Sequence, residues 1–103
     1  MTYAAYIQGM LRAVEEQPDD AEDKQYSVYQ EFENGMGEQT RRFVALSEAV
    51  RAFGHYTLNP AASIGITKRV FVTNGEDSVI MDWTYAKGLV WPRLPELTEV
   101  VPT

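Results

Sequence analysis

Apolar residues recur at steps of three and four along the first part of the chain, which is the spacing of one helix face. They are Tyr3, Tyr6, Ile7, Met10, Leu11 and Val14. Thr2 precedes them and can cap a helix, whereas Pro18 cannot continue one. We therefore predict a helix that begins after Thr2 and ends before Pro18, followed by a solvated loop through Asp23.

The spacing changes from helical to alternating after Gln25. The apolar positions of the first alternating run are Tyr26, Val28 and Phe32. A glycine-containing stretch, ENGMGE, separates this run from residues 40–46, and its two glycines can supply the positive φ angles of a longer or bulged turn. This pattern predicts a first β-hairpin.

A second helical pattern follows the first hairpin. Ser47 can cap it, Glu48 is favourable in the first turn, and the apolar stripe is Ala49, Val50, Ala52 and Phe53. We predict that this helix ends between Gly54 and Thr57 and that residues 58–65 form a connecting loop.

A second hairpin is predicted between residues 66 and 86. Its inward positions are Ile66, Val70, Val72, Val79, Met81, Trp83 and Tyr85, and the pair Asn74–Gly75 marks its turn. Residues 89–91 can add a short edge strand before Pro92 stops pairing, and residues 93–103 resemble an extended tail.

The order α-ββ-α-ββ predicts an α+β fold, in which a four-stranded antiparallel sheet built from two hairpins carries both helices on one face. The 103 residues are enough for one hydrophobic core and too few for two, so residues 1–103 are expected to form a single domain. No stretch approaches the roughly 20 apolar residues of a membrane span, and the amino terminus lacks a basic leader. A cytoplasmic location is the default expectation.

Groups for catalysis and metal binding are scarce. The chain has no cysteine, and its only histidine is His55. Glycine-containing stretches such as GMGEQT and TNGEDS lack the spacing of phosphate-binding or calcium-binding loops. We therefore predict no catalytic residues, no metal site and no cofactor. For His55 the preferred interpretation is an interaction with carbonyl groups at the end of the second helix.

The negative charge is concentrated at one end of the chain. Residues 1–39 carry nine acidic and two basic side chains, a net charge of −7, whereas residues 40–103 carry six and seven, a net of +1. Six of the acids form a dense run, Glu15, Glu16, Asp19, Asp20, Glu22 and Asp23. This charge repels nucleic acids and anionic membranes and attracts basic protein surfaces, so we expect the run to bind such a surface.

Three aromatic residues do not fit the core pattern. Alternation places Tyr29 and Phe71 on the sheet face opposite the helices, and Trp91 lies beside Pro92 near the tail. Together with Ile80 they would form an apolar patch that binds a partner or a second copy. Coverage by the C-terminal tail is the equally weighted alternative. Arg41 or Arg42 is expected to pair across the first hairpin with an acid such as Glu31 or Glu33.

These features indicate binding rather than turnover. The chain resembles in size, acidity and lack of cysteine the small inhibitors that phages and other mobile elements make against host nucleic-acid machinery, including anti-CRISPR and anti-restriction proteins. The resemblance implies a non-catalytic module that engages a basic, nucleic-acid-binding surface of a host protein and does not itself bind nucleic acid. The alternative is a phage or bacterial assembly protein that self-associates, as a homodimer for example, through the open sheet face or an edge strand. A small enzyme with a pocket between sheet and helices is disfavoured by the scarcity of catalytic groups.

Overall fold

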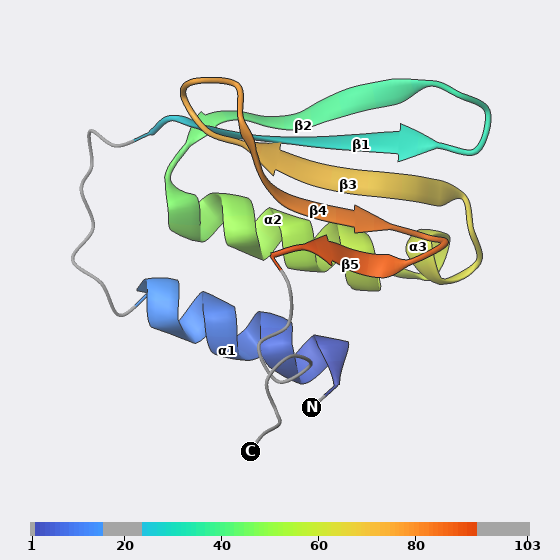
Figure 1. Cartoon of the computed structure of the whole chain (residues 1–103), viewed down its shortest axis with the longest axis horizontal. Helices are drawn as coiled ribbons and strands as arrows, with labels where there is room; N and C mark the ends of the chain where they lie inside the picture. The colour runs from blue at the N-terminus through green and yellow to red at the C-terminus, as the bar shows by residue number, and fades with distance from the viewer. Residues whose placement is uncertain (1, 16–23, 93–103) are drawn as a thin grey trace, which may run out of the picture.

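The computed structural model describes residues 2–15 and 24–92, which form three helices and five strands (Figure 1). The helices are α1 (Tyr3–Glu15), α2 (Leu46–Leu58) and α3 (Pro60–Ser63). The strands are β1 (Tyr26–Phe32), β2 (Gly37–Val44), β3 (Thr67–Thr73), β4 (Val79–Thr84) and β5 (Gly88–Trp91). The fold is therefore α+β, as predicted.

All strand pairs in the sheet are antiparallel, and the strand order is β2-β1-β3-β4-β5. The two predicted hairpins, β1–β2 and β3–β4, join through their first strands, with Val28 opposite Val72. The predicted number of four strands was wrong, because β5 pairs with β4 and makes a fifth. The short edge strand expected at residues 89–91 is confirmed as part of β5.

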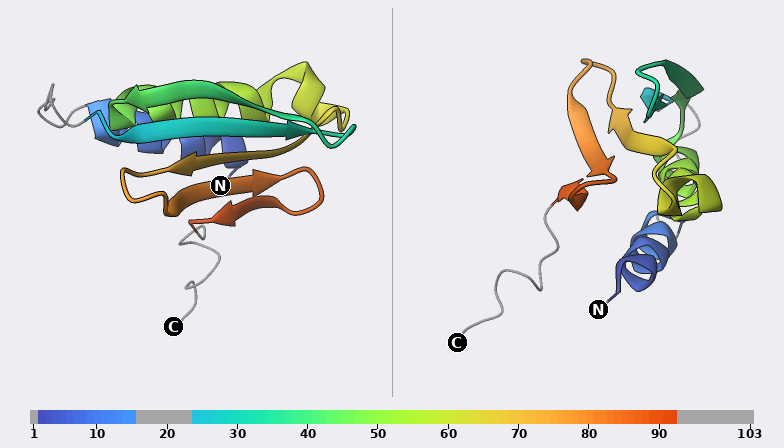
Figure 2. Two further views of the ribbon diagram at one scale, coloured as in Figure 1. Left: turned by 90° about the horizontal axis from the view of Figure 1, so that it is seen from above. Right: turned by 90° about the vertical axis from the view of Figure 1, so that its right-hand side faces the viewer.

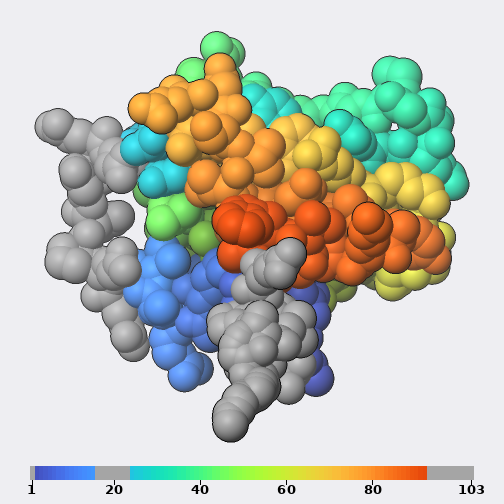
Figure 3. Space-filling model, viewed as in Figure 1, coloured from blue at the N-terminus to red at the C-terminus, as the bar shows by residue number. Residues whose placement is uncertain are grey.

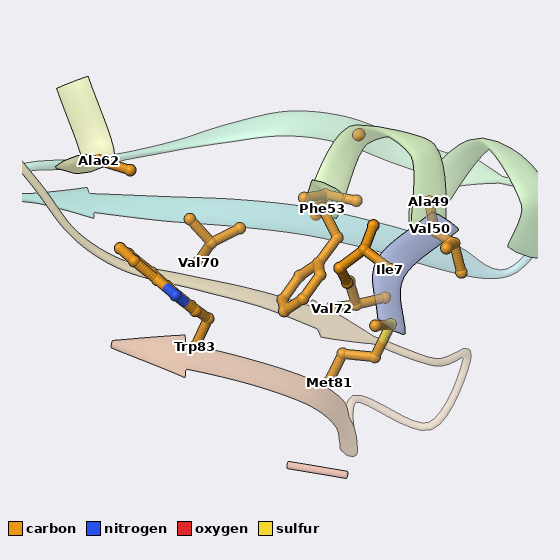
Figure 4. Packing of buried hydrophobic residues seen from close by; sticks show 11 residues of the cluster. Ile7, Ala49, Val50, Phe53, Ala62, Val70, Val72, Met81 and Trp83 are labelled. Carbon is orange, nitrogen blue, oxygen red and sulfur yellow. The ribbon is translucent and has the colours of Figure 1, made fainter. Parts of the chain in front are cut away.

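The three helices lie on one side of the sheet (Figure 2). The helix α2 packs against β1, β2 and β3, α3 packs against β3, and α1 packs against α2. The side chain of Phe53 projects from α2 toward the sheet, with Ile7 of α1 beside it (Figure 4). Valines 28, 70 and 72 of the two central strands are fully buried beneath these helices, so the core lies between α2 and the middle of the sheet.

Helix α1 lies close to α2 because residue 54 is glycine. A Cβ atom at Gly54 would lie 2.7 Å from Cγ2 of the buried Ile7, which is closer than two carbon atoms can approach without a shift. One turn later, the hydroxyl groups of Tyr3 and Thr57 are hydrogen-bonded at 2.8 Å. The crossing of the two helices thus combines a close apolar contact with one directional polar contact.

Of the two predicted helix caps, one is observed. Thr2 caps α1, because its Oγ1 accepts a hydrogen bond from the Ala5 N–H at 3.1 Å. The cap predicted at Ser47 was wrong, because the N-cap is Ala45, two residues earlier, and its side chain makes no capping hydrogen bond. The helix α2 begins at Leu46 and continues to Leu58, past the predicted end between Gly54 and Thr57.

The loop predicted for residues 58–65 contains the short helix α3. Asn59 caps it by accepting a hydrogen bond at Oδ1 from the Ala62 N–H at 3.0 Å, and Pro60 occupies its first turn. An Asn–Pro pair at this place is a helix-start signal, since proline lacks only an N–H that would be unpaired there.

Strand β2, at one edge of the sheet, is irregular. Two register shifts interrupt its pairing with β1, one between the partners of Tyr26 and Val28 and one between those of Val28 and Tyr29. Phe43 lies in the second half of the strand with a φ of 53°. Its N–H donates a hydrogen bond to Oγ of the buried Ser27 at 3.2 Å.

In the described part of the chain, the helices are too short or too polar to cross a bilayer.

Candidate binding surface on the open face of the sheet

One row of directly paired residues crosses all five strands. Starting from β2, the row is Gln39, Tyr29, Phe71, Asp82 and Trp91. Directly paired residues of neighbouring strands project to the same face of a sheet, and Tyr29 alternates with the buried Val28 and Gln30. The row therefore lies on the face away from the helices, which we call the open face. The strands that form it lie toward the viewer in Figure 3, with α1 below them.

Tyr29 and Phe71 form a stacked aromatic pair at the centre of this row. Their ring centroids are 5.0 Å apart and their planes are inclined by 16°. The Tyr29 hydroxyl accepts a hydrogen bond from Nε2 of Gln39 at 3.0 Å. Stacking and this hydrogen bond restrain both rings.

Arg69 fixes the other side of the aromatic pair. Its Cζ lies 4.2 Å from the ring centroid of Phe71. Its Nε and Nη2 donate hydrogen bonds to Oδ1 and Oδ2 of Asp82 at 2.9 and 3.0 Å, which makes a bidentate ion pair. A weaker contact joins Nη1 to Oε2 of Glu31 at 3.9 Å.

The hydrogen bonds that Arg69 donates to Asp82 raise the pKa of Arg69 above its ordinary value, although burial lowers it. The guanidinium is consequently charged at every pH at which the protein would be studied. With Glu31 and Asp82 beside one arginine, the centre of the open face carries a net charge of −1 from these three groups.

The four residues predicted to form an apolar patch on the open face do not all lie at its centre. Tyr29 and Phe71 lie on the open face where alternation placed them, and Trp91 is at the end of β5, 52% exposed and opposite Asp82. Ile80 was wrongly grouped with them, because it is partly buried and packs against the core cluster. It is the extra residue in the irregular pairing of β3 with β4, because Val72 pairs with Met81 and Thr73 pairs with Val79.

Of the six acids in the acidic run, one lies among the described residues. Glu15, the last residue of α1, forms an ion pair through Oε2 with Arg51 of α2. The other five acids, at positions 16, 19, 20, 22 and 23, lie outside the described residues. The cationic partner expected near the end of the first helix is thus supplied, for Glu15, by the protein itself.

The predicted ion pair across the first hairpin is not the one observed. Arg41 contacts Glu48 of α2 at 3.3 Å, and its guanidinium lies 5.9 Å from the Tyr56 ring centroid. The bulge before Arg41 turns its side chain to the helical face, where Val28, its partner on β1, also points. Glu31 pairs instead with Arg69 on the other neighbouring strand.

Sequence reasoning missed the contribution of Arg69 and Asp82 to the open face. Arg69 lies two positions before Phe71 on β3, and Asp82 lies opposite Phe71 on β4. Alternation along each strand could therefore have placed both side chains on this face. What the sequence did not reveal is that β1 pairs with β3. That pairing brings Glu31 next to Arg69 and Tyr29 next to Phe71.

The remaining polar and titratable side chains that we considered as candidate sites lie apart from one another or contact their neighbours. His55 is exposed and lies edge-on to Tyr56, with ring centroids 4.9 Å apart. Within residues 2–15 and 24–92, no three His, Asp or Glu side chains come together in a way that could hold a metal ion. On the open face the polar groups of Gln39, Arg69 and Asp82 bind neighbouring side chains.

Comparison with known proteins adds no assignment: the chain matches no family model, no curated protein and no solved structure.

Proposed function

We propose that this protein is a non-catalytic protein-binding module and that the open face of its sheet is a docking surface. The observation that supports this proposal is the preassembled group of Tyr29, Phe71, Arg69 and Asp82 on a face that no described helix covers. Tyrosine, tryptophan and arginine are the residues that most often dominate binding energies at interfaces. Here Tyr29 and Arg69 already contact Phe71 on either side and are hydrogen-bonded to Gln39 and Asp82.

The partner favoured by charge is a protein with a basic surface. The whole chain has a net charge of −6, the centre of the open face is negative, and the acids of residues 15–23 are close together in sequence. Such a surface would compete with nucleic acid for the lysines and arginines of its partner. In size and charge this resembles the inhibitors that phages direct at host nucleic-acid machinery, and we propose that role for the protein.

Self-association through the open face is the second candidate. It is supported by the same stacked aromatics, which could meet those of another copy. The sheet edges are poorer candidates for pairing. Strand β2 contains two register shifts, and β5 has only four residues before Pro92. Bulged and short strands are the features by which natural sheets avoid pairing at their edges.

Affinity capture tests this function. The tagged protein would be incubated with a lysate of its source cell, or of the host if it is viral, and washed at low and high salt. The first variant neutralises Asp19, Asp20, Glu22 and Asp23 to Asn or Gln, and the second carries Tyr29→Ser and Phe71→Ser. Matched controls are Glu33→Gln with Glu76→Gln, and Met36→Ser, which change exposed residues elsewhere.

We expect one nucleic-acid-processing protein to be retained by the parent and by both controls. High salt should release it from the parent, because exposed charge pairs are screened. Both test variants should lose it. Equal capture by the open-face variant and its control would refute the docking surface, and equal capture by the acid variant would refute the basic partner.

A further inference from the structure

Phe43 combines a strained backbone with an exposed aromatic side chain. Its φ of 53° lies in the left-handed region, where a bulky side chain is unfavourable and glycine or asparagine is usual. The side chain is nevertheless 56% exposed, so it contributes little to the core. Glycine is the usual residue at a left-handed position of a β-bulge.

The local structure maintains Phe43 in this conformation. Oγ of Ser27, a buried residue on β1, accepts the Phe43 N–H and replaces a ladder hydrogen bond that the bulge interrupts. The guanidinium of Arg42 lies 5.2 Å from the ring centroid of Phe43. Arg42 forms no ion pair with any carboxylate in the described part of the chain. Strain that the surrounding structure maintains at an exposed residue is a reason to look for a function there.

An apolar groove large enough for an aromatic ring lies between α1 and α2. Its volume is about 420 Å³, and its apolar lining consists of Ile7, Leu11, Val50, Gly54 and Leu58. Because an apolar cavity of roughly 150 Å³ is enough to hold a benzene ring, the phenyl group of a phenylalanine fits this volume. Arg51 also lines the groove, and the carboxylate of Glu15 forms an ion pair with it.

We propose that Phe43 of one molecule inserts into the α1–α2 groove of a second molecule. The ring would leave water for an apolar site, and Arg42, which has no carboxylate partner among the described residues, would approach the half-exposed carboxylate of Glu15. The ring and the groove belong to different surfaces of the chain, so the contact is head-to-tail and can continue into rings or filaments. This interaction uses neither the open face nor the acids at positions 16–23, and it is independent of the proposed function.

Two variants test the contact from its two sides. Phe43→Asn removes the ring and places at residue 43 a side chain that tolerates the left-handed region. Leu58→Arg blocks the groove at a residue near the end of α2, where a positive charge is favourable. The controls are Met36→Asn and Ile64→Arg, which alter exposed residues that do not line the groove, and the open-face double variant Tyr29→Ser with Phe71→Ser.

Sedimentation velocity would be measured over a wide range of protein concentration. We expect the parent and all three controls to gain mass as concentration rises, and each test variant alone to stay monomeric. An equimolar mixture of the two test variants should form a dimer and nothing larger, because only one intact ring and one intact groove are available per pair. The melting temperature of Phe43→Asn should equal or exceed that of the parent.

Three results would overturn the proposal. The first is a parent that stays monomeric at every concentration. The second is association of Phe43→Asn or Leu58→Arg alone to the same extent as the parent. The third is a mixture of the two that fails to form the dimer. A marked fall in the melting temperature of Phe43→Asn would show that the ring supports the fold, and would remove the strain argument.

Discussion

The hydroxyl group of Tyr3 is the most perturbed titratable group among the described residues that can respond to pH. Burial raises its pKa from 10.0 to about 12, although the hydrogen bond to Thr57 acts in the opposite direction. Thr57 also donates to the Phe53 carbonyl oxygen at 2.9 Å, so it keeps a partner if Tyr3 loses its hydroxyl. Tyr3 therefore couples the first turn of α1 to the C-terminal half of α2 by a bond that can be removed singly.

The pH dependence of this contact has a definite sign. In the unfolded chain Tyr3 loses its proton near pH 10, whereas in the folded protein it keeps the proton to about pH 12. Tyr3 therefore stabilises the fold fully below pH 10, and this contribution is lost between pH 10 and about 12, by at most roughly 2.7 kcal/mol.

We expect Tyr3→Phe to lower the free energy of unfolding at neutral pH by about 1 kcal/mol, through the lost hydrogen bond. The variant should also show a shallower decline above pH 10 than the parent. Urea unfolding at a series of pH values measures both effects. Parallel curves for parent and variant above pH 10 would contradict the raised pKa.

At the scale of elements, the contact between α1 and α2 depends on a single glycine. Gly54→Ala introduces a methyl group 2.7 Å from Ile7 Cγ2, an atom on a branched and buried side chain that cannot easily move. Gly9→Ala is the matched control, because a Cβ atom at Gly9 meets nothing within 4 Å. Both changes improve helix propensity by up to about 1 kcal/mol.

The two alanine variants should therefore shift stability in opposite directions. We expect Gly9→Ala to raise the free energy of unfolding by up to about 1 kcal/mol, and Gly54→Ala to lower it by about 1–3 kcal/mol, because overpacking costs more than the propensity gain. Urea unfolding of both variants measures the difference. A stabilised Gly54→Ala would mean that α1 is not held against α2 in this way.

Sequence patterns predicted some of the helices and strands and their pairing, and missed others. The helical and alternating spacings predicted α1, α2 and both hairpins, because each depends on residues near one another in the chain. They did not predict that β1 pairs with β3, since nothing local connects Tyr29 with Phe71. Helix α3 was missed although Asn59 and Pro60 mark its start, and the bulges of β2 changed the face on which Arg41 lies.

The candidate surface was predictable to a similar degree. Alternation placed Tyr29 and Phe71 on the open face, but the stacking of the two rings follows from the pairing of β1 with β3. The same pairing brings Glu31 to Arg69. The sequence did not predict the left-handed backbone of Phe43, because such a backbone is usual for glycine or asparagine and not for phenylalanine.

At the scale of the whole molecule, the fold separates two surfaces. The helices cover one face of the sheet and enclose the core, and the opposite face presents the aromatic and charged groups around Phe71 (Figure 2). We propose that another protein binds to this open face. Residue 71 is at its centre, whereas residue 36, in the turn between β1 and β2, is exposed but lies outside it.

Site-specific photo-crosslinking in lysate would show whether another protein lies against this face. A benzophenone analogue of phenylalanine would replace Phe71 in one sample and Met36 in a control, and mass spectrometry would identify the cross-linked proteins. We predict that position 71 cross-links to one basic protein that position 36 does not reach. Cross-links from position 71 that match those from position 36, or none at all, would contradict it.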